Sequence, residues 1–286
     1  MTLRRIITNL MNRFIDKHTT TYTTPYVRIR ELFYRTLRYK LAAKGFPITS
    51  NEKFLISLKN KHKGKRCFII GNGPSLNNCD LTLLKDEITF GFNSIFLHYD
   101  KMGFVPSYYI VEDVLVAEDR RKEINNLKGS VKFFGNHINY CIDNTKDTYW
   151  INVLMNYEDY ENFPHFSENA LRKIWVGGTV TYQAMQMAFY MGFTEVYMIG
   201  YDHSYTVPKS ADVKGFVIES TESDPNHFHP DYFGKGYRWH DPQVDRMELA
   251  YIKAKYHFEK NSRKIYNATV GGQLEVFDRI DYNKLF

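Results

Sequence analysis

The fold of this chain is decided by the stretch Cys67-Phe68-Ile69-Ile70-Gly71-Asn72-Gly73-Pro74-Ser75-Leu76. Its first four residues are apolar and are followed by turn residues, a pattern that predicts a short buried strand. Gly71 and Gly73 let the backbone turn tightly, Pro74 stiffens the turn and Ser75 adds a hydroxyl. A glycine turn after a strand can present N–H groups to a phosphate. The alternative is an ordinary strand-to-helix turn, because the third glycine of the dinucleotide fingerprint and the lysine of a P-loop are missing.

Strand and helix patterns alternate after this stretch. Short apolar runs predict strands, and longer runs with helical periodicity predict helices. The predicted strands are 88–92, 108–111, 131–134, 195–200 and 264–267, and the predicted helices are 179–191 and 242–260. This alternation predicts an α/β fold, with a Rossmann-like, mostly parallel sheet and helices on both of its faces.

The second of these helices carries the clearest local signals. Asp241 is a favourable N-cap and Pro242 suits the first helical position. Leu249, Ile252 and Tyr256 follow at helical spacing and predict the buried stripe.

Polar residues stand where several predicted strands end. They are Asn93, Ser94, Glu112, Asp113 and Asp202. Ligands of open α/β sheets bind at the carboxyl ends of the strands, so we expect these side chains to converge on one crevice. The three carboxylates are candidates for binding Mg²⁺ or substrate hydroxyl groups, although carboxylates are also common at strand ends.

A second glycine turn opens the helix predicted at 179–191. It reads Gly177-Gly178-Thr179-Val180-Thr181. The N–H groups at a helix start attract anions, which makes this turn a second candidate phosphate site. A Gly-Gly loop that is merely capped by Thr179 explains the same residues.

His240 directly precedes the helix predicted at 242–260. The positive end of a helix dipole disfavours imidazolium, so a neutral histidine that accepts a proton is expected there. A structural histidine is the alternative. The stretch 201–240 before it shows little periodicity, and such long irregular segments are usually functional or mobile. The pair His227 and His229 within it lacks a third ligand for zinc.

The composition indicates a globular protein with one large domain, with or without a smaller appendage. The chain has 286 residues, of which 43% are hydrophobic and 16% aromatic. Its three cysteines lack metal-ligand spacing, which fits the reducing cytoplasm. The sequence shows neither a signal peptide nor an apolar run of the ~20 residues that span a bilayer.

The net charge of +6 is distributed unevenly. Residues 1–66 carry 16 Lys/Arg and three acidic residues, a net of +13, whereas the rest of the chain has a net charge of −7. An acidic body argues against a nucleic-acid-binding protein. A basic arm at residues 1–63, with an amphipathic helix at 3–15, suits the anionic inner face of the cell membrane. The alternative is an arm that packs on its own domain or on a second subunit of a homo-oligomer.

Three runs of the chain together resemble the MptE-like domain family. They are 71–76, 177–181 and 192–202, the last reading Gly192-Phe193-Thr194-Glu195-Val196-Tyr197-Met198-Ile199-Gly200-Tyr201-Asp202. That family is named for an archaeal 6-hydroxymethylpterin diphosphokinase and includes flagellin-modifying motility accessory factors and proteins from bacterial polysaccharide loci. The order of motifs is also similar to that of bacterial sialyltransferases that use CMP-sialic acid. The resemblance covers about residues 64–282 and implies a domain at 64–286 with a lid at about 203–240.

The similarity to the sialyltransferases implies roles for individual residues. Residues that match or adjoin their nucleotide- and phosphate-binding positions are Gly71, Asn72, Gly73, Pro74, Ser75, Asn93, Ser94, Gly178, Thr179, Val180, Thr181, Asp202 and Tyr205. His240 matches their general base. Where they have an asparagine after the third strand, this chain has Glu112 and Asp113, which an anionic donor tolerates only with a metal ion or sugar hydroxyl groups nearby.

The cysteine usage and the basic arm predict a cytoplasmic protein that is peripheral to the membrane, and the resemblance implies a glycosyltransferase. It implies a nucleotide-activated donor, such as a CMP-linked acidic sugar, a glycan or lipid-linked acceptor and no metal requirement. The alternatives are a Mg²⁺-dependent diphosphokinase, which the acidic pair favours, and a module that binds a nucleotide without turnover.

Overall fold

The computed structural model describes residues 37–154 and 164–286 and has a large, wholly parallel sheet at its centre. Its strand order is β13-β12-β8-β1-β2-β3-β4-β5. The strands in chain order are β1 (Arg66–Ile70), β2 (Thr89–Phe92), β3 (Tyr108–Val111), β4 (Val131–Gly135), β5 (Thr148–Ile151), β8 (Glu195–Ile199), β12 (Lys264–Asn267) and β13 (Asp278–Arg279). The α/β fold with a Rossmann-like sheet is therefore confirmed. One strand beyond the last one predicted, β13, closes the edge next to β12.

The direction of winding reverses next to β1. From β1 to β5 each new strand is added on one side, whereas β8 returns to pair with the other side of β1. Such a switch point leaves a crevice at the carboxyl ends of the two central strands, where ligands of doubly wound sheets bind. The first glycine turn follows β1, so the fold brings it to this crevice.

Helices cover both faces of the sheet. Cys67 and Ile69 of β1 join the core under the longer helices α8 (Val180–Met191) and α9 (Val244–Lys260). Phe68 and Ile70 point to the opposite core, because side chains alternate along a strand. That second core lies under α5 (Tyr99–Met102), α6 (Val114–Asp119), α7 (Arg121–Asn126) and the 3₁₀ helices Pro74–Asn78, Leu81–Leu84, Asn93–His98, Asn136–Ile138 and Tyr282–Leu285.

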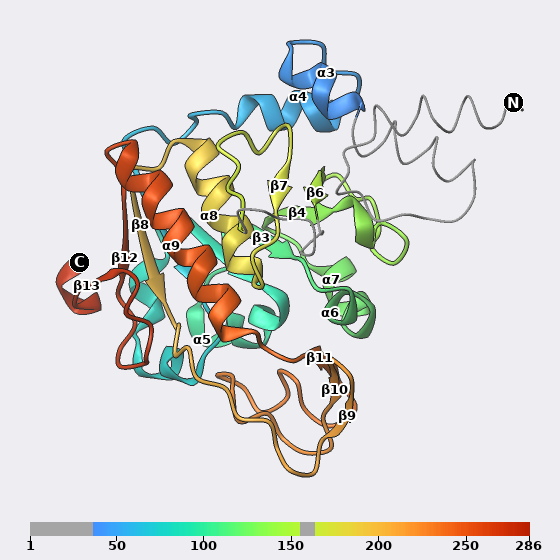
Figure 1. Ribbon diagram of the computed structural model, residues 1–286, viewed down its shortest axis with the longest axis vertical. Coiled ribbons are helices and arrows are strands. Elements are labelled where there is room, and N and C mark those ends of the chain that lie inside the picture. The colour runs from blue at the N-terminus through green and yellow to red at the C-terminus, as the bar shows by residue number, and fades with distance from the viewer. Residues whose placement is uncertain (1–36, 155–163) are drawn as a thin grey trace, which may run out of the picture.

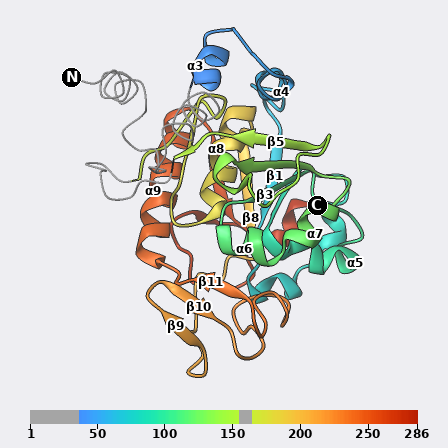
Figure 2. The same ribbon diagram turned by 90° about the vertical axis from the view of Figure 1, so that its right-hand side faces the viewer.

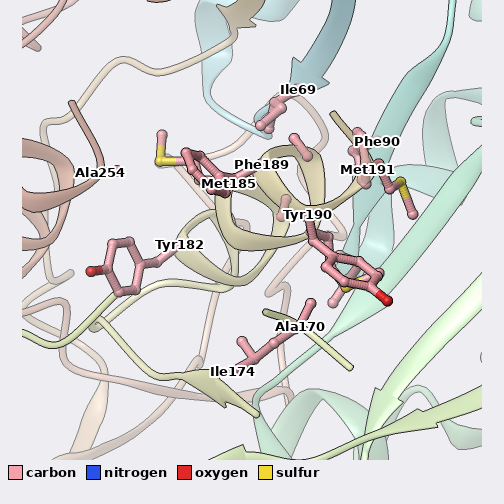
Figure 3. Close-up of a cluster of buried hydrophobic side chains, with 14 of the residues drawn as sticks. Ile69, Phe90, Ala170, Ile174, Tyr182, Met185, Phe189, Tyr190, Met191 and Ala254 are labelled. Carbon is pink, nitrogen blue, oxygen red and sulfur yellow. The ribbon is translucent and has the colours of Figure 1, made fainter. Parts of the chain in front are cut away.

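Helix α8 is buried on all sides. Every residue from Thr181 to Met191 is buried, and only Val180 of the helix is not. Figure 3 shows its side chains between Ile69 and Phe90 of the sheet, Ile174 of the short strand β7 (Ile174–Trp175) and Ala254 of α9. A helix that is buried on every side, as this one is, forms part of the core. Its start is consequently fixed relative to the strand ends.

Helix α9 differs from the sequence prediction in both its start and its buried face. It begins at Val244, because the Asp241 N–H is bonded to the Phe216 carbonyl and thus continues the preceding strand pairing. Leu249, Ile252 and Tyr256 are about half exposed, so the predicted stripe was wrong. The buried face consists of Met247, Ala250, Tyr251, Ala254 and Phe258.

The small residues of α9 explain this choice of face. Ala250 and Ala254 let the helix approach α8 closely, and a Cβ on Gly177 would collide with the Ala250 methyl group. Leu249, Ile252 and Tyr256 are left on the outside. Figure 1 shows α8 and α9 side by side over the sheet.

The stretch 201–240 contains regular structure that its sequence did not reveal. It forms an antiparallel sheet of β9 (Asp212–Lys214), β10 (Val217–Glu219) and β11 (Arg238–His240). Each strand has only three residues, too few for an alternating pattern to stand out. In both views this sheet lies at one end of the molecule, and α3 (Arg38–Ala43) and α4 (Ser50–Ser57) lie at the other (Figures 1 and 2).

The described part of the predicted basic arm packs on the body. Tyr39, Ala42, Leu55 and Leu58 belong to the same core as α8. The Tyr39 hydroxyl donates to the Trp150 carbonyl at 2.7 Å. The packed domain therefore begins before residue 64, whereas the amphipathic helix predicted at 3–15 lies outside the described residues. Within 37–154 and 164–286, every helix is too short or too polar to traverse a bilayer.

Candidate functional site

A cavity opens at the switch point between β1 and β8. Nine of the predicted site residues line it: Gly71, Asn72, Gly73, Asn93, Thr179, Val180, Thr181, Asp202 and Tyr205. The lining also includes Phe92, Gly200, Tyr201, His203, Ser204, Asn226, His227, Tyr232 and Tyr251. The other predicted residues, Pro74, Ser75, Ser94, Gly178, Glu112, Asp113 and His240, are not part of this lining. The two glycine turns, 107 residues apart at Gly71 and Gly178, thus meet at one cavity.

The first glycine turn is hydrogen-bonded to the end of β8. The Gly71 N–H donates to the Ile199 carbonyl at 2.7 Å, and the Gly73 N–H donates to the Gly200 carbonyl at 2.9 Å. These bonds extend the parallel pairing of β1 and β8 beyond the strands. The expectation that the N–H groups of this turn bind a phosphate is therefore wrong for Gly71 and Gly73.

Asp202 also holds the first glycine turn against the segment that follows β8. Its carboxylate accepts hydrogen bonds from the Ser75 N–H at 3.2 Å and from the Ser75 hydroxyl at 2.7 Å. A Cβ on Gly71 would collide with the Gly200 carbonyl, and one on Gly73 with the Asp202 carboxylate. Both glycines are thus required for close approach of two chain segments. Asp202 fastens the turn, which makes it a poor ligand for Mg²⁺.

The start of α8 forms a wall with hydroxyl groups. Thr179 caps the helix, because its hydroxyl accepts from the Thr181 N–H at 3.3 Å. The Thr181 and Tyr201 hydroxyls are 3.0 Å apart, and the Tyr251 hydroxyl lies close enough to bond to both threonines. Burial raises the pKa of Tyr201 and Tyr251, so both stay protonated donors. A helix N-terminus with hydroxyl donors suits an anion.

Two asparagines form another wall of the cavity. The Oδ1 atoms of Asn72 and Asn93 are buried, and neither has a hydrogen-bond partner among the described residues. Asn93 has a φ of 47°, a left-handed conformation that is rare outside glycine. Strained backbone of this kind is concentrated at functional sites. The two oxygens are free to accept hydrogen bonds from a ligand.

His240 lies outside the cavity lining and pairs with Asp113. Its Nδ1 is 2.8 Å from Asp113 Oδ2, and the residue is exposed to solvent. The hydrogen bond to Asp113 raises the pKa of His240. This shift is opposite to the one expected from the helix dipole, because α9 begins only at Val244 and the carboxylate is in direct contact. Asp113 also accepts from the Leu115 N–H at 2.8 Å, which caps α6.

Glu112 is buried between β3 and the helices. Burial, followed by the charge of Asp113, raises the pKa of Glu112 to about 8. A carboxyl group that is largely protonated at neutral pH is a weak ligand for Mg²⁺. In the part of the chain that the structure describes, His, Cys, Asp and Glu side chains nowhere gather in threes that could bind a metal. Among the described residues, the predicted carboxylates thus form no metal site of three side chains.

The model of one protein family matches this chain. It is described as 6-hydroxymethylpterin diphosphokinase MptE-like and matches residues 47–208. The chain belongs to the MptE-like family. No curated protein matches the sequence.

The solved structures add one likeness at low identity. It is to the MAf glycosyltransferase from Magnetospirillum magneticum AMB-1, with 13% identity and a TM-score of 0.45. The alignment covers 100% of this chain and 48% of the other, so this MptE-like chain spans about half the length of that protein.

The MptE-like cavity also contains residues that sequence reasoning missed. His227 lines it beside Tyr232, and its Nδ1 is 2.7 Å from Asp224 Oδ2. His203 also lines the cavity and has a φ of 55°. Its Nε2 is 3.2 Å from Glu248 Oε1. The run His227-Phe228-His229 was considered only as a metal site. The aromatic and acidic residues around it were the signal for a packed histidine.

Proposed function

We propose that this chain is a transferase that binds a nucleotide-activated sugar in the switch-point cavity and transfers the sugar to a hydroxyl acceptor. One observation carries the proposal. The hydroxyl-rich start of α8 and the unpaired oxygens of Asn72 and Asn93 line the same cavity. A nucleotide offers groups complementary to both, because it has an anionic phosphate and ribose hydroxyl donors.

The donor phosphate is placed at the start of α8. Val180 and Thr181 lie at the positive end of the helix dipole, and Tyr201 and Tyr251 add protonated hydroxyls. The same groups stabilise the negative charge that develops on the phosphate oxygen as the sugar leaves. The ribose hydroxyls face Asn72 and Asn93.

His240 is proposed as the general base. Because the Asp113 carboxylate only accepts hydrogen bonds, His240 Nδ1 must be the donor and Nε2 is free to take a proton. The acceptor hydroxyl passes its proton to Nε2, and its oxygen bonds to the anomeric carbon. The bond from that carbon to the phosphate oxygen breaks, and its electron pair leaves with the nucleotide.

The family description favours a second candidate, Mg²⁺-dependent diphosphoryl transfer from ATP. Asp202 and Asp113 are hydrogen-bonded to Ser75 and to His240 and Leu115, respectively, and Glu112 has a raised pKa. These residues would have to rearrange to hold the metal. The sugar-transfer proposal requires no such change.

A thermal-shift panel tests the proposal with CMP, CDP, UDP, GDP, ADP and ATP, each with and without Mg²⁺. A ligand that binds the folded state raises the melting temperature according to its excess over Kd. We expect a metal-independent shift, reduced by the variant Thr181→Val, which removes a hydroxyl at the phosphate position. The matched control is Thr194→Val, since Thr194 bonds to the Lys65 carbonyl away from the cavity. A shift with ATP alone, and only with Mg²⁺, would replace this proposal by the diphosphokinase.

The basic N-terminal region is proposed to hold the enzyme at the anionic inner face of the membrane. A lipid-linked or growing glycan acceptor is available at that surface. The charge of residues 1–66 supports this placement, since each Lys or Arg near an anionic surface contributes about 1 kcal/mol.

A further inference from the structure

His227 is a cavity residue for which the proposed reaction has no use. Its ring is stacked on Tyr232 at a centroid distance of 3.9 Å and an interplanar angle of 6°. Its neighbour Phe228 donates its N–H to the Asn72 carbonyl at 2.9 Å. The histidine is therefore fixed next to Asn72, on the nucleoside side of the cavity.

Asp224 determines which ring nitrogen carries the proton. Its side chain is 3% exposed and accepts from His227 Nδ1, from the Asn226 N–H at 2.7 Å and from the Phe233 N–H at 2.9 Å. Burial raises the pKa of Asp224, but these hydrogen bonds outweigh it and lower the pKa overall, so the carboxyl stays ionised. Because a carboxylate cannot donate, His227 Nδ1 must donate to it.

In the tautomer that this hydrogen bond selects, Nε2 is an acceptor. Among the described residues, only Asp224 hydrogen-bonds to this imidazole. Nε2 joins the unpaired Oδ1 atoms of Asn72 and Asn93, which line the same cavity. Three residues with an unpaired acceptor thus line the cavity, and two such acceptors suffice for the hydroxyls of a ribose.

We propose that His227 determines base specificity by accepting a hydrogen bond from an exocyclic amino group, and that it selects cytosine or adenine nucleotides over uracil or hypoxanthine nucleotides. The inference rests on the proposed function, because it assumes that a nucleotide occupies the cavity. Cytosine and adenine carry an amino group where uracil and hypoxanthine carry a carbonyl oxygen. That oxygen faces the lone pair of Nε2 and is repelled.

The test compares pairs of nucleotides that differ at this one group. Isothermal titration measures the affinities of CMP and UMP, and of AMP and IMP, for the wild-type protein and for His227→Ala. We expect at least one amino nucleotide to bind about tenfold more tightly than its keto partner, which corresponds to roughly 1.4 kcal/mol. His227→Ala should remove this preference, because the amino nucleotide loses its hydrogen bond and the keto partner is no longer repelled.

Two further variants separate recognition from structure. Asp224→Asn frees the ring to protonate Nε2 instead, so it should weaken the preference or reverse it toward the keto nucleotide. His229→Ala is the matched control, because His229 belongs to the same run but is absent from the cavity lining. It should leave the preference intact. If His227→Ala does not fold, Asp224→Asn still tests whether the protonation of the His227 ring sets the preference.

The possible outcomes distinguish a failure of this inference from a failure of the proposed function. Equal wild-type affinities within both pairs, or an equal loss for both partners in His227→Ala, would overturn the role of His227 alone. If the folded wild-type protein bound none of the four nucleotides, the proposed function would fail and this inference with it.

Discussion

Asp113 and His240 are 127 residues apart in the chain and form one hydrogen-bonded pair. From the sequence, Asp113 was predicted to bind a metal ion or substrate hydroxyl groups, and His240 was predicted to be the base. The pairing gives Asp113 a different role, which is to position His240. It orients the imidazole and raises the pKa of His240, which makes the ring a stronger base at its free nitrogen.

The variant Asp113→Asn should shift the pH dependence of the reaction. A general base acts in its neutral form, so activity rises with pH through the pKa of His240 and is lost below it. Removing the carboxylate charge lowers that pKa, and the acidic limb of kcat/KM should move to lower pH. His240→Ala should reduce kcat by about 10²–10⁴-fold.

The measurement is a pH–rate profile of sugar transfer between about pH 5 and 9. Asp212→Asn is the control, because Asp212 is exposed and pairs with Lys214 in the small antiparallel sheet. An acidic limb that stays in place in Asp113→Asn would show that His240 is not the titrating base.

At the scale of elements, α9 shows how the identity of the smaller residues decides which face is buried. Both faces carry large apolar side chains at helical spacing, yet the face that packs is the one that also contains Ala250 and Ala254. Close approach to the buried helix α8 requires small residues between the two axes. The spacing of apolar residues in the sequence does not show which face meets this requirement.

Truncations on the two faces of α9 should have very different costs. Phe258 is fully buried against Phe189, so Phe258→Ala should destabilise the fold by about 3–5 kcal/mol. Ile252 is 53% exposed, and Ile252→Ala should stay within about 0.5 kcal/mol of the wild type. Urea denaturation measures both values. Comparable losses in the two variants would mean that the outer face of α9 is covered in solution.

At the scale of the whole molecule, charge is separated along the chain. Residues 1–66 carry a net of +13 and the remaining residues a net of −7. The described helices α3 and α4 lie at the end of the molecule opposite the small antiparallel sheet (Figures 1 and 2). Phe46 is 69% exposed at this end of the chain, next to Gly45 and Lys44.

The full chain should therefore sediment with anionic vesicles and not with neutral phosphatidylcholine vesicles. Binding should weaken as salt is raised, because exposed charges are screened beyond about 10 Å at 0.1 M ionic strength. Deleting residues 1–36 should reduce binding, whereas Lys209→Glu with Lys214→Glu, at the opposite end, should not. A dimer that disappears on the same deletion, without any vesicle binding, would assign the arm to a second subunit.

The amino-acid sequence was enough to predict the class of fold and the edge of the sheet at which the candidate site lies. Runs such as 67–70 and 196–199 have no charged residue, as expected of strands covered on both faces, and they alternate with helical patterns. Because parallel strands all end at one edge, the polar residues that follow them could be assigned to a common crevice. The glycines at 71, 73 and 177 were visible in the sequence, and at each of them a Cβ would collide with a neighbouring segment.

Only the tertiary structure decided which atoms of that crevice are available to a ligand. The N–H groups of Gly71 and Gly73 are bonded to β8, a segment more than 120 residues away, and Asp202 is bonded to Ser75. The partners of His240 and His227 likewise come from the fold, and so does the burial that raises the pKa of Glu112. Sequence patterns record the preferences of neighbouring residues. Hydrogen bonds and desolvation depend on segments that meet only when the chain is folded.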